Sequence, residues 1–298
     1  MQKITPHLWF NKEAVEAAQF YTSIFPDSRV VSQSLIQGTP SGDCDIVDFE
    51  IMGYRFQALS AGPLFTFNPS ISIMVNFDPS QDKDARERID EIWEKLSEGG
   101  KALMPLGEYP FSERYGWVQD KYGFSWQLIY TKPEGEIRPL IIPALLFVSA
   151  TGDRAEKAVD FYLSVFKNTQ QGALVRYPKD MEPNKEGGIM FTDFMLENQW
   201  FAAMDGSSTM HDFNFNEAVS FMVNCKDQEE IDYFWEQLSA VPEAEQCGWV
   251  KDKFGVSWQI VPQHMGELIE KNPKQTTPAM LGMKKIVIAE LEKAGEAR

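Results

Sequence analysis

The stretch Tyr122-Gly-Phe-Ser-Trp-Gln-Leu-Ile decides the fold, because the chain contains it twice. It returns as Phe254-Gly-Val-Ser-Trp-Gln-Ile-Val, and the preceding Gly116-Trp-Val-Gln-Asp-Lys returns as Gly248-Trp-Val-Lys-Asp-Lys. Further upstream, Ile89-Asp-Glu-Ile-Trp-Glu-Lys-Leu-Ser has its counterpart in the second half, although the second copy is ten residues shorter between these blocks. A repeat of this length predicts two homologous domains.

The two copies set the domain boundaries. The first copy runs from 1 to 132 and the second from 139 to 262, and residues 133–138 contain the Pro, Gly and charged residues typical of a linker. Residues 263–298 have no counterpart in the first copy. Their apolar residues at helical spacing predict a tail helix around Met280–Leu291 that needs burial to be stable. We expect it to dock onto a domain or onto a partner chain, which leaves a homodimer open.

The composition excludes several classes of function. The chain has 298 residues and a formal net charge of −16, and such a field repels nucleic-acid backbones and anionic membrane surfaces. No apolar stretch approaches the roughly 18 residues that span a bilayer, and the amino terminus lacks an apolar signal segment. Three scattered cysteines are typical of a reducing, cytoplasmic compartment. Neither GxGxxG nor GxxxxGK[ST] occurs, so the common dinucleotide and phosphate loops are missing.

Each copy repeats a smaller order of elements. In the first copy, a strand over Ile4–Phe10 and a helix ending near Pro26 precede three short strands. The same order begins again at Ile71–Phe77 and ends with a strand over 124–130. The sequence therefore predicts an α+β fold in which each copy consists of two βαβββ modules.

These features resemble a known superfamily. Two βαβββ modules per copy, the helix-ending Phe20-Tyr and the closing Asp120-Lys-Tyr-Gly-Phe-Ser-Trp-Gln are similar to the vicinal-oxygen-chelate proteins, which include glyoxalase I and bleomycin-resistance proteins. Within that superfamily, Ile4-Thr-Pro-His-Leu-Trp-Phe and Gln246-Cys-Gly-Trp-Val-Lys-Asp-Lys resemble the PhnB-like branch, often labelled 3-demethylubiquinone-9 3-methyltransferase. The resemblance covers nearly the whole chain. It implies tandem domains, each a cupped mixed sheet with helices outside, around one small-molecule pocket.

The resemblance also implies positions for a divalent metal, which metal-dependent relatives of glyoxalase I hold with His or Glu from the first and last strands of the modules. These positions fall on Thr5, Ser72 and Gln127, and in the second copy on Gln259. None carries a His or a carboxylate, and an amide oxygen lacks the charge that anchors Mn, Ni or Zn. We therefore expect neither a metal nor a cofactor. His7 lies two places after Thr5 on the same strand face, so a register error of two residues would make it a ligand.

Strand parity predicts which side chains of the first copy point inward. They are aromatic or neutral polar, and the expected ligand-binding residues are Thr5, His7, Trp9, Ser72, Met74, Asn76, Ser125 and Gln127. This mixture suits a small, largely uncharged molecule, and the alternative is that the same side chains fill a small core. The second copy has Ala144 and Leu146 in place of His7 and Trp9. We therefore expect the ligand in the first copy, under the segment Met104–Tyr115.

Two functions fit these residues. One is a binder that sequesters or senses a small molecule without a metal, as the bleomycin-resistance relatives imply. The other is a metal-independent or atypical glyoxalase- or lyase-type enzyme in which His7 is the general acid or base, a role that suits its ordinary titration near neutral pH. The missing metal ligands favour the binder. The methyltransferase label gets no support, because the chain lacks the glycine-rich loop with which common methyltransferases hold S-adenosylmethionine.

Overall fold

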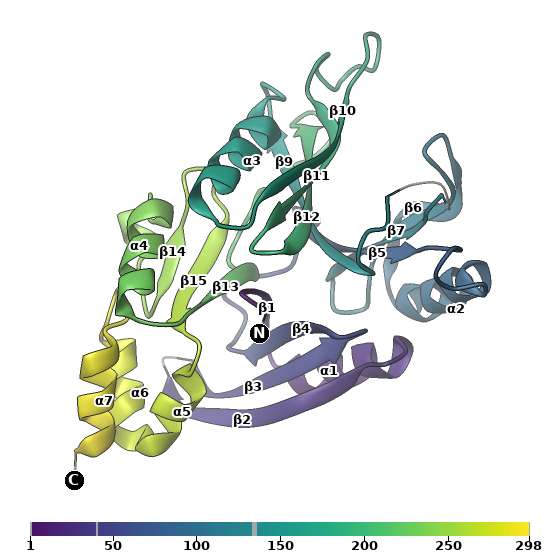
Figure 1. Cartoon of the computed structure of the whole chain (residues 1–298). Helices are drawn as coiled ribbons and strands as arrows, with labels where there is room; N and C mark the ends of the chain where they lie inside the picture. Colours follow the sequence, from purple (N-terminus) through teal and green to yellow (C-terminus); the bar gives the residue numbers. More distant parts are fainter. Residues whose placement is uncertain (1, 40, 133–135, 298) are drawn as a thin grey trace. The chain divides into compact units, whose positions relative to one another are not determined.

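The computed structural model forms two compact units (Figure 1). It describes residues 2–39, 41–132 and 136–297, so residues 133–135 of the predicted linker lie outside the described part. Unit 1 takes its residues from 1–23, 27–66 and 215–298. Unit 2 takes its residues from 24–26 and 67–214.

Unit 1 is built on a seven-stranded mixed sheet, sheet A, in the order β14-β15-β13-β1-β4-β3-β2. Its strands are β1 (Ile4–Phe10), β2 (Arg29–Thr39), β3 (Gly42–Ile51), β4 (Tyr54–Ser60), β13 (Val219–Cys225), β14 (Trp249–Lys251) and β15 (Ser257–Pro262). Its helices are α1 (Ala14–Ile24), α4 (Gln228–Leu238), the 3-10 turn η1 (Pro242–Ala244), α5 (Met265–Lys271), α6 (Pro273–Leu281) and α7 (Ile288–Glu296).

Unit 2 is built on an eight-stranded mixed sheet, sheet B, in the order β10-β11-β12-β9-β5-β8-β7-β6. Its strands are β5 (Ile71–Phe77), β6 (Lys101–Tyr109), β7 (Ser112–Gln119), β8 (Ser125–Tyr130), β9 (Ile141–Ser149), β10 (Gln170–Arg176), β11 (Ile189–Leu196) and β12 (Gln199–Ser207). Its helices are α2 (Ala85–Ser97) and α3 (Arg154–Val165).

Each sheet combines modules from different copies. Sheet A joins β1–β4 of the first copy to β13–β15 of the second, and sheet B joins β5–β8 of the first copy to β9–β12 of the second. This corrects the expectation that residues 1–132 and 139–262 each close into a cup of their own. Both junctions are alike, because the first strands of two modules pair antiparallel, β1 with β13 and β5 with β9. Since the copies are homologous, a module from either copy offers the same edge, as in domain swapping.

The repeated stretch folds in the same way in both units. Asp120 accepts backbone N–H bonds from the second and fourth residues after it, and its other oxygen accepts the indole N–H of Trp126 at 2.9 Å. Asp252 and Trp258 make the same set of bonds, again with 2.9 Å to the indole nitrogen. Gly123 allows this tight turn, because its φ of +84° lies in the left-handed region that favours glycine. Both tryptophans are buried in the helix-covered core, as the sequence predicts.

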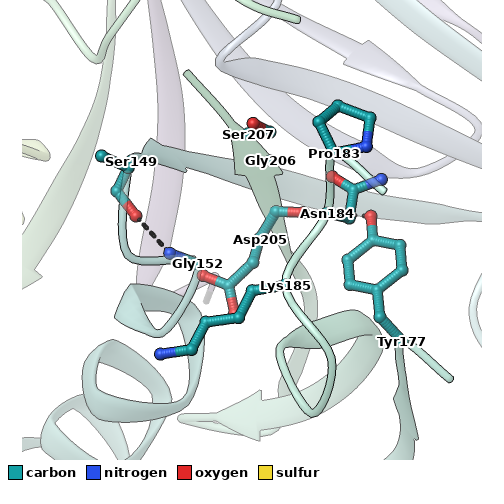
Figure 2. A pocket seen from close by; sticks show the side chains of 10 residues that line it. Ser149, Gly152, Tyr177, Pro183, Asn184, Lys185, Asp205, Gly206 and Ser207 are labelled. Atoms are coloured by element: carbon teal, nitrogen blue, oxygen red, sulfur yellow. Dashed lines mark hydrogen bonds between the residues drawn. The ribbon is translucent and has the colours of Figure 1, made fainter. Parts of the chain in front are cut away.

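The helix layer is also fixed by equivalent contacts. Ser60 ends β4, and its hydroxyl accepts the backbone N–H of Ala14 at the start of α1 at 3.2 Å. In unit 2, Asp205 of β12 stands in the same place and accepts the N–H groups of Arg154 and Ala155 at 3.0 and 2.9 Å. Figure 2 shows its carboxylate directed toward the start of α3. A side-chain oxygen at this position satisfies amide groups that a helix start cannot bond internally.

The tail docks as predicted, but it is not one helix. Met283 and Leu291 are buried and Val287 is half-buried, which confirms that the tail packs by its apolar side, here onto unit 1. The predicted helix over Met280–Leu291 is wrong at its centre, because residues 282–287 are non-helical between α6 and α7. The carbonyls of Met283 and Lys284 accept hydrogen bonds from a neighbouring segment, so they are not used inside a helix. Within the described part of the chain, no helix has the length and apolar character needed to cross a membrane.

Candidate functional site

Sheet A has one apolar face and one mixed face. The apolar face is buried under helices and carries side chains such as Ile4, Leu8 and Trp258. The other face is here called the inner face. On it, the strand register places four side chains in one row, namely Trp249, Gln259, Met222 and Thr5. The adjacent row on the same face is Ser257, Ser220, His7 and Gln57. The inner face therefore combines residues of the first copy with residues of the second.

Sheet A is strongly curled. Two strands, β15 and β13, separate β14 from β1, so in a flat sheet β14 and β1 would lie about 14 Å apart. The ring of Trp249 nevertheless meets the ring of His7 edge-on, with 5.6 Å between the centroids, and lies 6.3 Å from the ring of Trp9. Contacts at this range require the two ends of the row to bend toward each other. Unit 1 thus has the cupped sheet that the sequence predicts, built from different strands.

His7 lies at the bottom of this cup. Its side chain is 3% exposed, and its Nδ1 is buried without a hydrogen-bond partner in the described part of the chain. Burial lowers the pKa of His7 to about 3, so the imidazole is neutral at pH 7. Asp48 shares the inner face, but its carboxylate is engaged by Gln57 at 2.9 Å and by Ser32 at 2.8 Å. Desolvation by burial alone accounts for the lowered pKa of His7.

The two equivalent glutamines of the repeat differ in their partners. The Nε2 of Gln259 and that of Gln127 each donate to a serine hydroxyl on the neighbouring strand, at 3.0 and 2.7 Å. In unit 2, the Oε1 of Gln127 also accepts a bond of 2.7 Å from the hydroxyl of Tyr115. In unit 1, Cys247 stands at the place of Tyr115, and no described residue donates to the Oε1 of Gln259. That acceptor is available to a ligand.

A second hydrogen bond on this face is also present in unit 2 and missing in unit 1. In unit 2, the indole N–H of Trp117 donates to Ser125 at 2.7 Å. The equivalents in unit 1 are Trp249 and Ser257, but Trp249 packs against His7, and the hydroxyl of Ser257 is buried without a partner. Among the described residues, three buried side-chain polar atoms lack a partner, and two of them belong to His7 and Ser257 on this one face. Native proteins satisfy nearly all such atoms, so this face is exceptional.

The inner face of unit 2 is closed by contrast. Its polar groups bond to one another, and its centre is an apolar cluster of Met74, Ile142, Ala144 and Ala202. Further apolar side chains pack against this cluster, namely Ile129, Phe191, Trp200 and Met204. This face matches the alternative in which the predicted pocket residues fill a core.

Unit 2 also contains two cavities. The larger has a volume of about 490 Å³ and is lined by Glu136, Arg138, Gln170, Gln171, Gly172, Ala173 and Asp193. The guanidinium of Arg138 lies 3.9 Å above the ring of Trp200, and its charge is matched by Asp193 at 2.7 Å and Glu136 at 2.8 Å. The smaller cavity is the one in Figure 2, between Tyr177, Asn184 and Asp205. Its volume of about 20 Å³ has room for about one water molecule.

The structure divides the predicted ligand-binding residues between the two sheets. Thr5, His7 and Trp9 lie on β1 of sheet A. The other five lie on sheet B of unit 2, namely Ser72, Met74, Asn76, Ser125 and Gln127. The segment Met104–Tyr115, expected to cover the ligand, belongs to the β6–β7 hairpin of sheet B. The sequence-based set therefore mixes residues from two faces, because it assumes that each copy folds on itself.

Four residues of the inner face were missed by the sequence analysis of the site. They are Trp249, Ser220, Met222 and Ser257, which the second copy contributes. Trp249 could have been found, since Gly248-Trp-Val repeats Gly116-Trp-Val, but only together with the exchange of modules between the copies.

The residues at the metal positions of the superfamily do not fit a divalent transition metal. In unit 1 these positions carry Thr5, Ser220 and Gln259, and the hydroxyl of Ser220 is occupied by the amide of Gln259. His7 adds one neutral imidazole, whose neighbours across the strands are Ser220 and Gln57. Among the described residues, no three His, Cys, Asp or Glu side chains are grouped so that they could hold a metal ion.

Comparison with known proteins identifies the family. The sequence model of the family described as 3-demethylubiquinone-9 3-methyltransferase matches residues 2–129 and 139–261. The chain belongs to this family. The two matched ranges agree with the two sequence copies, so the family domain occurs twice. Among curated proteins, none matches the chain.

Several solved structures are similar to part or most of the chain. A chain from Bacillus cereus, described as a putative 3-demethylubiquinone-9 3-methyltransferase, PhnB protein, is 38% identical, and the match covers 44% of this chain and 100% of that one, with a TM-score of 0.39. Glyoxalase I from Zea mays is 12% identical with a TM-score of 0.51, and the match covers 90% of this chain and 96% of that one. A putative dioxygenase from Bacillus subtilis is 11% identical with a TM-score of 0.50, covering 86% and 84%. The last two similarities show the vicinal-oxygen-chelate fold over most of the chain.

Proposed function

We propose that unit 1 binds one small, largely uncharged molecule on the inner face of sheet A, without a metal, and so sequesters or senses it. The observation that carries this proposal is the difference between equivalent positions of the two units. Gln127 and Ser125 have partners, whereas the hydroxyl of Ser257 is buried without one within the described residues, and the Oε1 of Gln259 lacks the donor that Tyr115 gives to Gln127. A buried polar group without a partner costs about 1–3 kcal/mol, which a ligand would recover.

The chemistry of the face limits the ligand. The Nε2 of Gln259 is already used, so its free Oε1 needs a hydrogen-bond donor from the ligand. The rings of Trp9 and Trp249 stand at 74° to each other and offer surface to a flat or apolar group. The charged side chain of this sheet end, Lys251, is paired with Glu217 at 2.6 Å. With no unpaired charge among these groups, an uncharged ligand is favoured.

Binding is better supported than catalysis. A general acid at neutral pH would need an imidazolium at His7, but burial lowers the pKa of this group to about 3. The alternative, a metal-independent or atypical glyoxalase- or lyase-type enzyme, would require the ligand itself to raise that pKa. Methyl transfer is not part of the proposal, because the glycine-rich loop of common methyltransferases is absent from the sequence. All three cysteines are free thiols, which supports the further proposal of a reducing, cytoplasmic location.

The test is native mass spectrometry of the full chain after incubation with a metabolite extract, with elemental analysis of the same sample. We expect one small-molecule adduct and no stoichiometric Mn, Ni or Zn. Gln259→Leu should remove the adduct, and the matched variant Gln127→Leu should keep it. An adduct lost only in Gln127→Leu, or only in Arg138→Met of the larger unit 2 cavity, would assign the ligand to unit 2 and contradict the proposal. No adduct at any extract concentration would contradict it as well.

A further inference from the structure

The outer edge of sheet A, at β14, differs from the equivalent edge of unit 2. In unit 2, β7 pairs on its outer side with β6, where Gly107 stands opposite Tyr115. The second copy is ten residues shorter at this point and has no counterpart of β6. Its strand β14 is only three residues long, and its outward backbone groups bond to the loop before it, Trp249 to Gln246 and the carbonyl of Lys251 to the N–H of Ala240.

The non-helical tail segment 282–287, here called the strap, bonds to the two residues that precede β14. The backbone N–H of Cys247 donates to the carbonyl of Met283 at 2.9 Å, and that of Gly248 donates to the carbonyl of Lys284 at 2.7 Å. Cys247 is the equivalent of Tyr115, so the strap bonds to unit 1 at the position where β6 bonds to β7 in unit 2. The carbonyl of Gly248 meanwhile accepts the N–H of Ile260, so this residue is held from both sides.

The strap is anchored by two buried side chains, Met283 and Ile286, and by one glutamine. Ile286 is fully buried, and Gln228 of α4 bonds to the strap end twice, to the carbonyl of Ile286 at 3.1 Å and to the N–H of Ile288 at 2.9 Å. Gly248 allows this close packing, because a Cβ at its position would lie 3.2 Å from Cγ1 of Ile286 and 2.9 Å from a backbone oxygen. Its φ of +87° also favours glycine.

The remaining contacts of the strap are at the surface. Lys284 pairs with Glu245 at 3.1 Å and Lys285 with Asp232 at 2.5 Å, and the lysine side chains are 61% and 36% exposed. Exposed ion pairs of this kind hold weakly and are screened by salt. The strap therefore has few buried contacts beyond Met283 and Ile286.

The residue after the strapped pair is Trp249, whose ring covers His7. We infer that the strap positions Trp249 over His7 and thereby controls access to the inner face of sheet A. Release of the strap frees the backbone just before Trp249 and opens the site, and docking of the strap closes it. This inference concerns the same site as the proposed function and adds its regulation, but its test needs no ligand.

The test compares three variants of the full chain. Ile286→Asp places a charge at the buried anchor, and Ala289→Asp places the same charge at an exposed tail position as the matched control. Gln228→Leu removes both anchoring bonds without adding a charge, in case Ile286→Asp does not fold. Hydrogen exchange followed by mass spectrometry reports on the strap, on residues 247–251 and on residues 115–119 of unit 2. Acylation by diethylpyrocarbonate, which attacks neutral imidazole, reports on access to His7, with His211 of unit 2 as the reference.

We expect exchange in the strap and in residues 247–251 to accelerate at least tenfold in Ile286→Asp and in Gln228→Leu, with residues 115–119 unchanged. Acylation of His7 relative to His211 should rise by a similar factor, and Ala289→Asp should behave as the unchanged protein. Faster exchange in the strap alone, with slow acylation of His7, would overturn the inference. Acceleration in unit 2 as well, or no release of the strap in either variant, would also overturn it. Loss of the ligand adduct has no part in this result, so failure here and failure of the proposed function can be told apart.

Discussion

Replacing His7 by Gln should remove a specific part of the acid sensitivity of unit 1. In the folded chain, burial holds the pKa of His7 at about 3, whereas the unfolded chain has the ordinary value of about 6.5. Below pH 6.5 the imidazole of His7 is therefore protonated in the unfolded state but stays neutral in the folded state. Unfolding becomes more favourable as the pH falls. The effect is nearly absent at pH 7 and grows until the folded pKa is reached.

The size of the effect follows from the difference in pKa. At pH 5, the pH is about 1.5 units below the pKa of the imidazole in the unfolded chain. Protonation then stabilises the unfolded state by about 2 kcal/mol relative to the folded state. Wild-type unit 1 should thus lose about 2 kcal/mol more than His7→Gln between pH 7 and pH 5. Carboxylates also titrate in this range, but they are common to both proteins and cancel in the comparison.

The assay is urea unfolding followed by tryptophan fluorescence at pH 7 and pH 5. His264→Gln serves as the matched control, since His264 is a partly exposed residue that precedes α5 in the same unit. It should leave the pH dependence of wild type unchanged. If wild type and His7→Gln lose the same unfolding free energy between pH 7 and pH 5, within about 0.5 kcal/mol, His7 is not buried in its neutral form. The cup of sheet A around His7 would then be contradicted as well.

Three further outcomes are expected. Tyr115→Phe should lower the unfolding free energy of unit 2 by about 1–2 kcal/mol in urea titrations, because the Oε1 of Gln127 loses its donor; no change would contradict the closed network. Asp120→Asn and Asp252→Asn should each cost about 2–4 kcal/mol, since each carboxylate accepts three N–H groups, and the two losses should agree within about 1 kcal/mol by thermal unfolding. Incubation with EDTA should leave the unfolding midpoint unchanged, because the donor set of the inner face does not fit a divalent transition metal; a lowered midpoint that zinc restores would count against this.

The sequence was sufficient to predict the frame of the molecule. The repeated Asp-Lys-x-Gly-x-Ser-Trp-Gln specifies a complete local structure. Its aspartate, glycine and tryptophan fix one turn and the start of the strand that follows. Contacts of this kind join residues only a few positions apart, as between Asp120 and Trp126, so the pattern carries them directly. The α+β class, the two copies and the buried tryptophans were therefore predictable.

The pairing of the modules could not be predicted in the same way. The edge of β1 can meet either β5 of its own copy or β13 of the other, and both carry similar sequence, Phe67-Asn-Pro-Ser-Ile-Ser and Phe215-Asn-Glu-Ala-Val-Ser. Local pattern and strand parity are the same for both choices. The structure pairs β1 with β13, and for this reason His7 lies beside Trp249 and on the same face as Gln259 rather than Gln127. The tail was mispredicted for a related reason. Its helical spacing carries no information on Cys247 and Gly248, whose N–H groups bond to its carbonyls.

The contrast between the units separates what the fold needs from what the site needs. Unit 2 shows that this fold can give partners to the glutamine and the serine of its inner face, through Tyr115 and Trp117. The fold therefore does not require the unpartnered groups of unit 1. Keeping the hydroxyl of Ser257 buried costs stability, because it lacks the hydrogen bond that Ser125 makes. That cost is explained if a ligand supplies the missing bonds, and a ligand bound in this way would stabilise unit 1 and leave unit 2 unchanged.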